Sequence, residues 1–138
     1  MLEEKQIRSL KMGALLAVAQ GSKTPPRFII LEHNADQAKD LPSVVLVGKG
    51  VTFDTGGYSI KTRDGMVGMK ADMGGGAAVM GAMLTISKLK IPLHVVGLIP
   101  SADNMIDGGA YRPQEVITAS NGKTIEVIST DAEGRMLL

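Results

Sequence analysis

Three short runs of apolar, largely β-branched residues most constrain the fold of this chain. They are RFIILE at residues 27–32, SVVLV at 43–47 and LHVVGLI at 93–99, and such runs are typical of strands. One helical pattern precedes the first run, at residues 3–20, and another lies between the second and third, at 73–89. Strands that alternate with helices predict an α/β fold, a layered α/β/α domain with a mostly parallel twisted sheet.

The boundaries of the two helices follow from the spacing of apolar residues and from glycines. Residues 3–20 carry apolar side chains from Leu10 to Val18 at helical spacing, and Gly21 stands where a C-cap is expected. Residues 73–89 begin with three glycines and then present a broad apolar face. We therefore expect one continuous entry helix and one long helix against the sheet.

Two further segments differ from this pattern. The runs at residues 116–119 and 124–128 flank Ser-Asn-Gly-Lys, which predicts a hairpin. Residues 48–72 have no sustained period and are rich in glycine and charge. Loops of that length in a compact domain are usually functional.

Composition restricts the function. With 138 residues, 44% of them hydrophobic, the chain is long enough for one domain. A formal net charge of +1 and 3% aromatic residues argue against nucleic acid or an anionic membrane as a partner. The charged N-terminus and the absence of a 20-residue apolar stretch favour a cytoplasmic protein. Cysteine is absent, so any metal must be bound through oxygen or nitrogen.

Charged residues gather where the expected strands end and helices begin. Ligands of α/β proteins collect at the carboxyl ends of the strands. If residues 131–133 are extended, the alternation of side chains places two carboxylates on one face. The charged residues at these positions are Lys49, Asp54, Lys61, Asp72, Asp131, Glu133 and Arg135.

Each of these residues also has an ordinary structural interpretation. Acids at a strand end are often only solvated, Asp72 could cap the following helix, and single lysines are usually at the surface. Together, however, four converging carboxylates repel one another unless cations hold them. Oxygen ligands then favour two divalent ions. Lys49 could join them only as a neutral amine, with a pKa depressed by the ions.

Three motifs resemble the leucyl aminopeptidases, the dimetal exopeptidases whose signature is NTDAEGRL. They are GKGVTFDTGGYSIK at 48–61, MKADMGGGAAV at 69–79 and STDAEGRM at 129–136. Residues 12–33 and 108–127 are also similar to the catalytic domain of that family. The resemblance therefore covers nearly the whole chain.

The resemblance implies a set of metal ligands. One ion is held by Asp54, Asp131 and Glu133, with the Asp131 carbonyl as a further ligand. The other is held by Lys49, Asp54, Asp72 and Glu133, so Asp54 and Glu133 bridge the pair. The ions implied are Zn²⁺ or Mn²⁺, with Mg²⁺ as a further option.

The resemblance also implies a reaction, the hydrolysis of the N-terminal peptide bond of a peptide substrate by metal-activated water. In this interpretation Lys61 polarises the scissile carbonyl, and Arg135 holds a bicarbonate ion that shuttles protons. Met69 lines the pocket for the first side chain of the substrate. Ser129 stands where the family has asparagine, and its shorter side chain is expected to lose a substrate hydrogen bond.

Family members carry an N-terminal domain before the entry helix and a long segment after the signature. That segment supplies the rest of the sheet, much of the substrate pocket and most oligomer contacts. We therefore interpret residues 1–138 as a single partial catalytic domain, with an entry helix at 1–21 and an α/β metal-site core at 22–138. We expect a homo-oligomeric, inactive fragment. The alternative is a non-catalytic remnant or interaction module that retains only the fold.

Three other patterns have functional interpretations that are weaker than their structural ones. Gly122-Lys123-Thr124 imitates the end of a phosphate loop, but a hairpin turn explains it better. The glycines at 74–76 could cradle a phosphate, and close packing of the helix onto the metal loop is the better explanation. His33 and His94 lack metalloprotease spacing, so we expect core or edge histidines.

Overall fold

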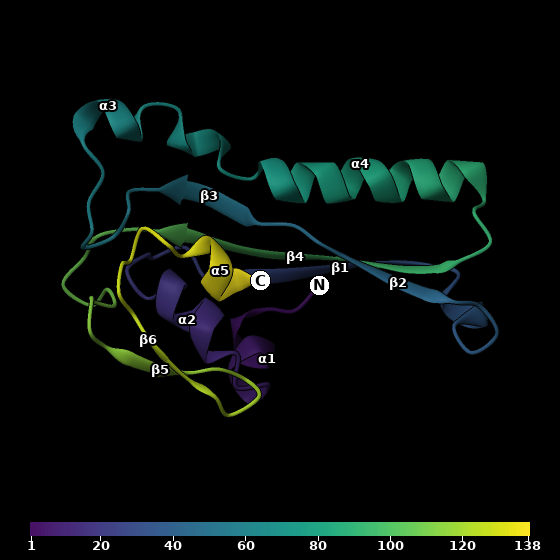
Figure 1. The fold of residues 1–138 in the computed structure, drawn as a ribbon, viewed down its shortest axis with the longest axis horizontal. Coiled ribbons are helices and arrows are strands. Elements are labelled where there is room, and N and C mark those ends of the chain that lie inside the picture. The colour runs from purple at the N-terminus through teal and green to yellow at the C-terminus, as the bar shows by residue number, and fades with distance from the viewer.

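A four-stranded sheet forms the centre of the computed structural model, which describes all residues 1–138 (Figure 1). Its central strand is β4 (His94–Asn104), which pairs antiparallel with β1 (Arg27–His33). Along its other edge β4 pairs in parallel, first with β2 (Ser43–Val47) and then with β3 (Gly50–Asp54). Two of the three pairings are parallel, which confirms the mostly parallel sheet.

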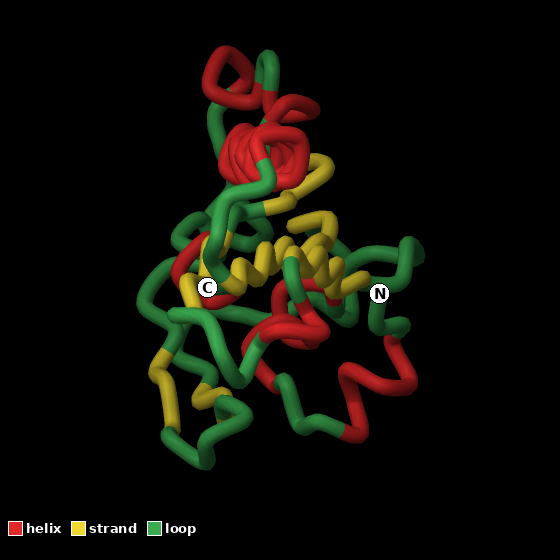
Figure 2. Tube along the Cα trace, turned by 90° about the vertical axis from the view of Figure 1, so that its right-hand side faces the viewer, coloured by secondary structure: helices red, strands yellow, loops and turns green.

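Helices cover both faces of this sheet. The long helix α4 (Gly74–Leu89) lies on one face, while α1 (Glu4–Ser9), α2 (Gly13–Ala19) and α5 (Gly134–Leu137) lie on the other (Figure 1). Figure 2, turned by 90°, shows α4 end-on on one side of the strands, with α1, α2 and α5 on the opposite side. The layered α/β/α architecture expected from the alternation of elements is confirmed.

The two faces of the sheet carry two separate apolar cores. Alternate residues of β4 point to opposite faces, so Val95 and Ile99 contact α4 while Ala102 lies in the other core. The core beneath α4 has four buried residues, Val79, Met83, Val95 and Ile99. The core on the opposite face has ten, Ile7, Leu15, Ala17, Val18, Ala19, Val51, Ala102, Tyr111, Val127 and Leu137. The larger core lies on the face that carries the N- and C-terminal helices.

The prediction of one continuous helix over residues 3–20 was wrong. The chain leaves α1 after Ser9 and starts α2 at Gly13, with Lys11 in the left-handed region at φ 54°. A Cβ atom at Gly13 would lie 2.1 Å from the carbonyl oxygen of Thr118, so the start of α2 is pressed against the hairpin. Gly21 does not adopt the left-handed conformation of a C-cap. Glycine is required there because a Cβ atom would lie 2.2 Å from the carbonyl oxygen of Met105.

The expectation of an irregular loop over residues 48–72 was also wrong in part. This segment contains β3, the short helix α3 (Arg63–Met66) and the 3₁₀ turn η2 (Met69–Ala71). A glycine and two polar residues in GVTFD hide the strand in the sequence. It forms because β4 extends to Asn104, beyond the run predicted at 93–99, and offers a parallel partner.

The predicted hairpin is confirmed. β5 (Val116–Thr118) and β6 (Thr124–Glu126) form a separate antiparallel pair joined by a turn in which Gly122 has φ 84°. The chain also has one 3₁₀ turn between β1 and β2, η1 (Ala35–Gln37). None of its helices combines the length and the apolar character that crossing a membrane requires.

Candidate metal centre

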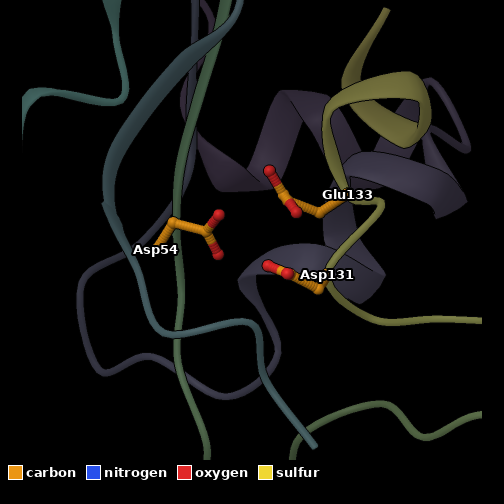
Figure 3. A group of neighbouring side chains, drawn as sticks. All are labelled: Asp54, Asp131 and Glu133. Carbon is orange, nitrogen blue, oxygen red and sulfur yellow. The ribbon is translucent and has the colours of Figure 1, made fainter. Parts of the chain in front are cut away.

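Three carboxylates face a common space at one end of the sheet (Figure 3). Asp54, Asp131 and Glu133 each offer an oxygen atom, and these atoms lie within 4.8 Å of one another. Asp54 and Glu133 are buried, while Asp131 is exposed at the rim. The cluster is therefore open to solvent on the side of Asp131.

Two different backbone features place these carboxylates. Asp54 is the last residue of β3 and pairs with Asn104, the last residue of β4, so it stands at the carboxyl ends of parallel strands as the sequence predicted. The expected extended conformation of residues 131–133 was wrong. The chain turns there instead, because the N–H of Asp131 donates to Ser129 Oγ (3.2 Å) and Glu133 has helical torsion angles.

Two lysines join the carboxylates in pairs. Lys61 Nζ lies 3.1 Å from Asp54 Oδ2 and 2.5 Å from Asp131 Oδ1. Lys49 Nζ lies 2.7 Å from Asp72 Oδ2 and 2.5 Å from Glu133 Oε1. The structure thus brings together every charged residue expected at the strand ends and helix starts except Arg135.

The ion pairs dominate the ionisation of these groups. Burial disfavours the charged form of Lys49 and Lys61, but their carboxylate partners outweigh it, so the pKa of each lysine is raised. Burial also favours the neutral form of Asp54, but hydrogen bonds from Gly56 N–H and Asn104, together with Lys61, lower its pKa. Both lysines are cationic and Asp54 is ionised at neutral pH.

The glycines at the start of α4 bring Lys49 and Asp72 together. A Cβ atom at Gly48 would lie 2.3 Å from the carbonyl oxygen of Gly75, and Gly76 N–H donates to Lys49 O at 2.8 Å. This backbone contact confirms that the glycines serve close packing of the helix onto the metal loop.

Asp72 does not cap α4, because the N-cap position is Met73. Asp72 instead ends η2, and its carboxylate reaches Lys49. The capping interpretation of Asp72 was therefore wrong, and its carboxylate instead belongs to the charged cluster.

The residues of the cluster fit divalent metal ions. Glu133 Oε2 is buried and has no hydrogen-bond partner, which is costly for a carboxylate oxygen unless a cation satisfies it. The four carboxylates also outnumber the two lysines that pair with them. A set of carboxylate oxygens without thiolate suits Mg²⁺ or Mn²⁺ and is compatible with Zn²⁺.

The remaining predicted residues lie around this cluster. Arg135 is an exposed residue of α5, forms no salt bridge, and lines an apolar cavity of 340 Å³ on the side of α2. Met69 is half-buried at the start of η2. Ser129 uses its hydroxyl to hold the turn at Asp131. The structure does not place Arg135 in contact with the carboxylates.

Sequence reasoning missed three buried polar residues beneath the cluster. Asn104, Tyr111 and Thr130 are each at most 1% exposed and are linked by hydrogen bonds. The sequence signal was weak, since Asn104 lies beyond the apolar run at 93–99 and Tyr111 stands out only as one of two tyrosines. Nothing in their local sequence indicated that they would meet.

Comparison with known proteins identifies the family. The model of the cytosol aminopeptidase family, catalytic domain, matches residues 1–138. The chain belongs to the cytosol aminopeptidase family. It is 56% identical over 137 residues to a probable cytosol aminopeptidase of Exiguobacterium sibiricum, a match that covers 99% of the chain and 28% of that relative.

Further relatives agree with this assignment. A probable cytosol aminopeptidase of Bacillus subtilis is 56% identical over 138 residues, again covering 99% of the chain and 27% of the relative. The crystal structure of the cytosol aminopeptidase from Coxiella burnetii superposes with a TM-score of 0.92 at 40% identity, covering 99% of this chain and 29% of that one. The chain thus spans less than a third of the length of the relatives it matches.

Proposed function

We propose that this chain carries the dimetal centre of a metal-dependent aminopeptidase, a hydrolase that removes N-terminal residues from peptides. The observation that carries the proposal is the convergence of Asp54, Asp131 and Glu133, with a buried Glu133 oxygen that lacks a partner. One ion would be held by Asp54, Asp131 and Glu133. The second would be held by Asp54, Asp72, Glu133 and the neutral amine of Lys49, which loses its proton when the ion binds, with Zn²⁺ or Mn²⁺ as the first candidates and Mg²⁺ as another.

The other residues of the site receive roles in the same proposal. When bound, the two ions supply Lewis-acid activation of water and of the scissile carbonyl. Lys61 is cationic and lies at the edge of the cluster, so its Nζ can donate to the developing oxyanion of the substrate. Arg135 would bind bicarbonate as a proton carrier, while Met69 and Ser129 would contact the substrate.

The substrate pocket requires more than these 138 residues. Peptide side chains bind in enclosed pockets beside the reacting groups. The main cavities of this chain, of 480, 340, 320 and 570 Å³, are lined by residues other than the three clustered carboxylates. The chain covers only 27–28% of its relatives' length. We therefore propose that the longer form cleaves peptides, preferring apolar N-terminal residues, and that the 138-residue chain alone is inactive.

The cellular and oligomeric setting belongs to the same proposal. The relatives are named cytosol aminopeptidases, which supports a cytoplasmic location, and we expect a homo-oligomer. The competing function is that of a remnant or interaction module without catalysis. Exposed valines on β2 offer an association surface, which favours this alternative.

A chimera tests the function. Residues 1–138 would replace the matching segment of the Bacillus subtilis relative, and hydrolysis of leucine anilide would be measured with Zn²⁺ or Mn²⁺. We expect turnover in the chimera and none in the isolated chain. A chimera that is folded but inactive beside an active parent would contradict the catalytic assignment.

Two variants of the chimera separate the roles. Asp131→Asn should reduce metal content and activity together, because it removes a proposed ligand charge. Lys61→Gln should leave the metal content unchanged and lower kcat, since Lys61 is proposed to act on the substrate. Loss of metal in Lys61→Gln would contradict its assigned role.

A further inference from the structure

A single buried side chain connects the two segments that carry the clustered carboxylates. Asn104 is fully buried at the end of β4. Its Nδ2 donates to Asp54 Oδ1 at 2.8 Å and to the carbonyl oxygen of Thr130 at 2.9 Å. Both amide hydrogens are therefore used, one on the β3 side and one beside Asp131.

The first of these hydrogen bonds orients Asp54. Asp54 Oδ1 accepts from Asn104 and also from Gly56 N–H at 2.9 Å. Two donors on Oδ1 leave Oδ2 directed at Lys61, 3.1 Å away, on the side of the cluster. The rotamer of this carboxylate is thus set by groups that are not themselves proposed metal ligands.

The second hydrogen bond fixes Thr130, the neighbour of Asp131. Thr130 is fully buried, and its Oγ1 donates to Gly56 O at 2.6 Å and accepts from Ser59 N–H at 2.8 Å. Its carbonyl oxygen accepts from Asn104 and from Tyr111 Oη at 3.0 Å. Burial, and then the nearby carboxylates, raise the pKa of Tyr111, so its phenol remains a donor.

Only an amide meets the requirements at position 104. The site needs two donors from one neutral, buried group that faces a carboxylate and a carbonyl. The opposite amide orientation would set Oδ1 against both of these acceptors. In the observed orientation Oδ1 has no partner and lies 3.2 Å from the point that a Cβ atom on Gly57 would occupy. The two hydrogen bonds donated by Nδ2 therefore support this orientation, although they leave Oδ1 without a partner.

From this geometry we propose that Asn104 is a positioning residue of the metal centre, which aligns Asp54 with Asp131 before any ion binds. This inference rests on the proposed function for the identity of the centre. Removal of a residue that hydrogen-bonds to a metal ligand typically weakens metal affinity about 10- to 100-fold. We expect a loss of metal affinity in this range when Asn104 is replaced.

Tyr111 provides a matched control, because it bonds the same Thr130 carbonyl and does not touch Asp54. Mn²⁺ binding to the 138-residue chain would be measured by calorimetry for the wild type, Asn104→Ala, Asn104→Asp and Tyr111→Phe. We expect Asn104→Ala and Asn104→Asp to weaken binding about 10- to 100-fold. Tyr111→Phe should change it much less, although it also lowers Tm. Equal weakening by Tyr111→Phe and Asn104→Ala would overturn the role through Asp54.

Two further measurements do not depend on metal, and the first of them also needs no folded variant. In the metal-free wild type, the two Nδ2 protons of Asn104 should exchange slowly with solvent in NMR spectra, and rapid exchange would overturn the inference. A crystal structure of metal-free Asn104→Ala should show Asp54 rotated away from its wild-type rotamer, and an unmoved Asp54 would also overturn it. Absence of Mn²⁺ binding by the wild type would instead contradict the proposed function, and the NMR result would still decide the role of Asn104.

Discussion

The two ends of the central sheet differ in how completely the chain covers them. At the end formed by β3 and the last residues of β4, Val51, Ala102 and Asn104 are all buried. At the other end, β2 leaves Val45 56% exposed and Val47 45% exposed. Both residues share the face of the sheet opposite α4. Of the two, only Val47 borders the cavity beside α2 and α5.

The difference shows where this chain is structurally self-sufficient. The ten-residue core includes Tyr111, Val127 and Leu137, so distant segments close over the end that carries the carboxylates. The β2 end has only α4 and its four-residue core on one face. The chain therefore holds its candidate metal ligands by itself but leaves an apolar surface and a strand edge open, both of which favour association.

The largest expected effect is a loss of stability when the ten-residue core is disrupted. Leu15→Ala should lower the free energy of unfolding by about 2–5 kcal/mol, because it opens a cavity at a fully packed position. Leu89→Ala, at an exposed position near the end of α4, should cost less than about 0.5 kcal/mol. Urea denaturation followed by circular dichroism measures both. Similar losses for the two variants would show that the ten-residue core does not dominate stability.

The next effect concerns the contact between α4 and the site. Gly48→Ala should destabilise the chain by about 1–3 kcal/mol, because the new methyl group meets the Gly75 carbonyl of the backbone. The same variant should weaken Mn²⁺ binding, since the shift displaces Lys49. Thermal unfolding and calorimetry test the two consequences, and an unchanged Tm would mean that the helix start moves away without cost.

A glycine on the same helix should have the opposite sign. Gly81 is exposed within α4, and a Cβ atom there would contact nothing within 4 Å. Gly81→Ala should therefore stabilise the chain by about 0.5–1 kcal/mol through lower entropy of the unfolded state. A rise in the urea midpoint is the expected result, and a fall would reveal a contact that the free surface of α4 makes.

The smallest effect on stability is expected at the β2 end of the sheet. Val45→Lys should leave the free energy of unfolding within about 0.5 kcal/mol, because the side chain is already exposed. It should, however, shift the chain from self-associated species toward monomer in light scattering. Val67→Lys, at a 77% exposed position away from β2, is the matched control and should change neither property. A monomeric wild type would contradict association through this end.

Local patterns in the sequence were sufficient for the architecture. β-branched runs, helical spacing and the Ser-Asn-Gly-Lys turn each depend on neighbouring residues, so the α/β/α layers and the hairpin could be predicted. The position of Asp54 could also be expected, because it ends a strand that pairs in parallel with β4. The same rule does not explain Asp131 and Glu133, which follow the separate hairpin and lie in a turn before α5. The break between α1 and α2 could not be predicted, since Lys11 has no local feature that marks its left-handed conformation.

Tertiary structure alone decided how the side chains of the site are oriented. β3 forms because β4 is long enough to pair with it, and the turn at Asp131 depends on the anchoring of Thr130 by Ser59, Gly56 and Asn104. Asn104 and Thr130 are 26 residues apart, and Asn104 and Asp54 are 50 apart. The sequence by itself determined which charged side chains the chain possesses and near which strand ends they stand. Their orientation came from long-range hydrogen bonds in a buried environment, where each polar group left without a partner costs free energy.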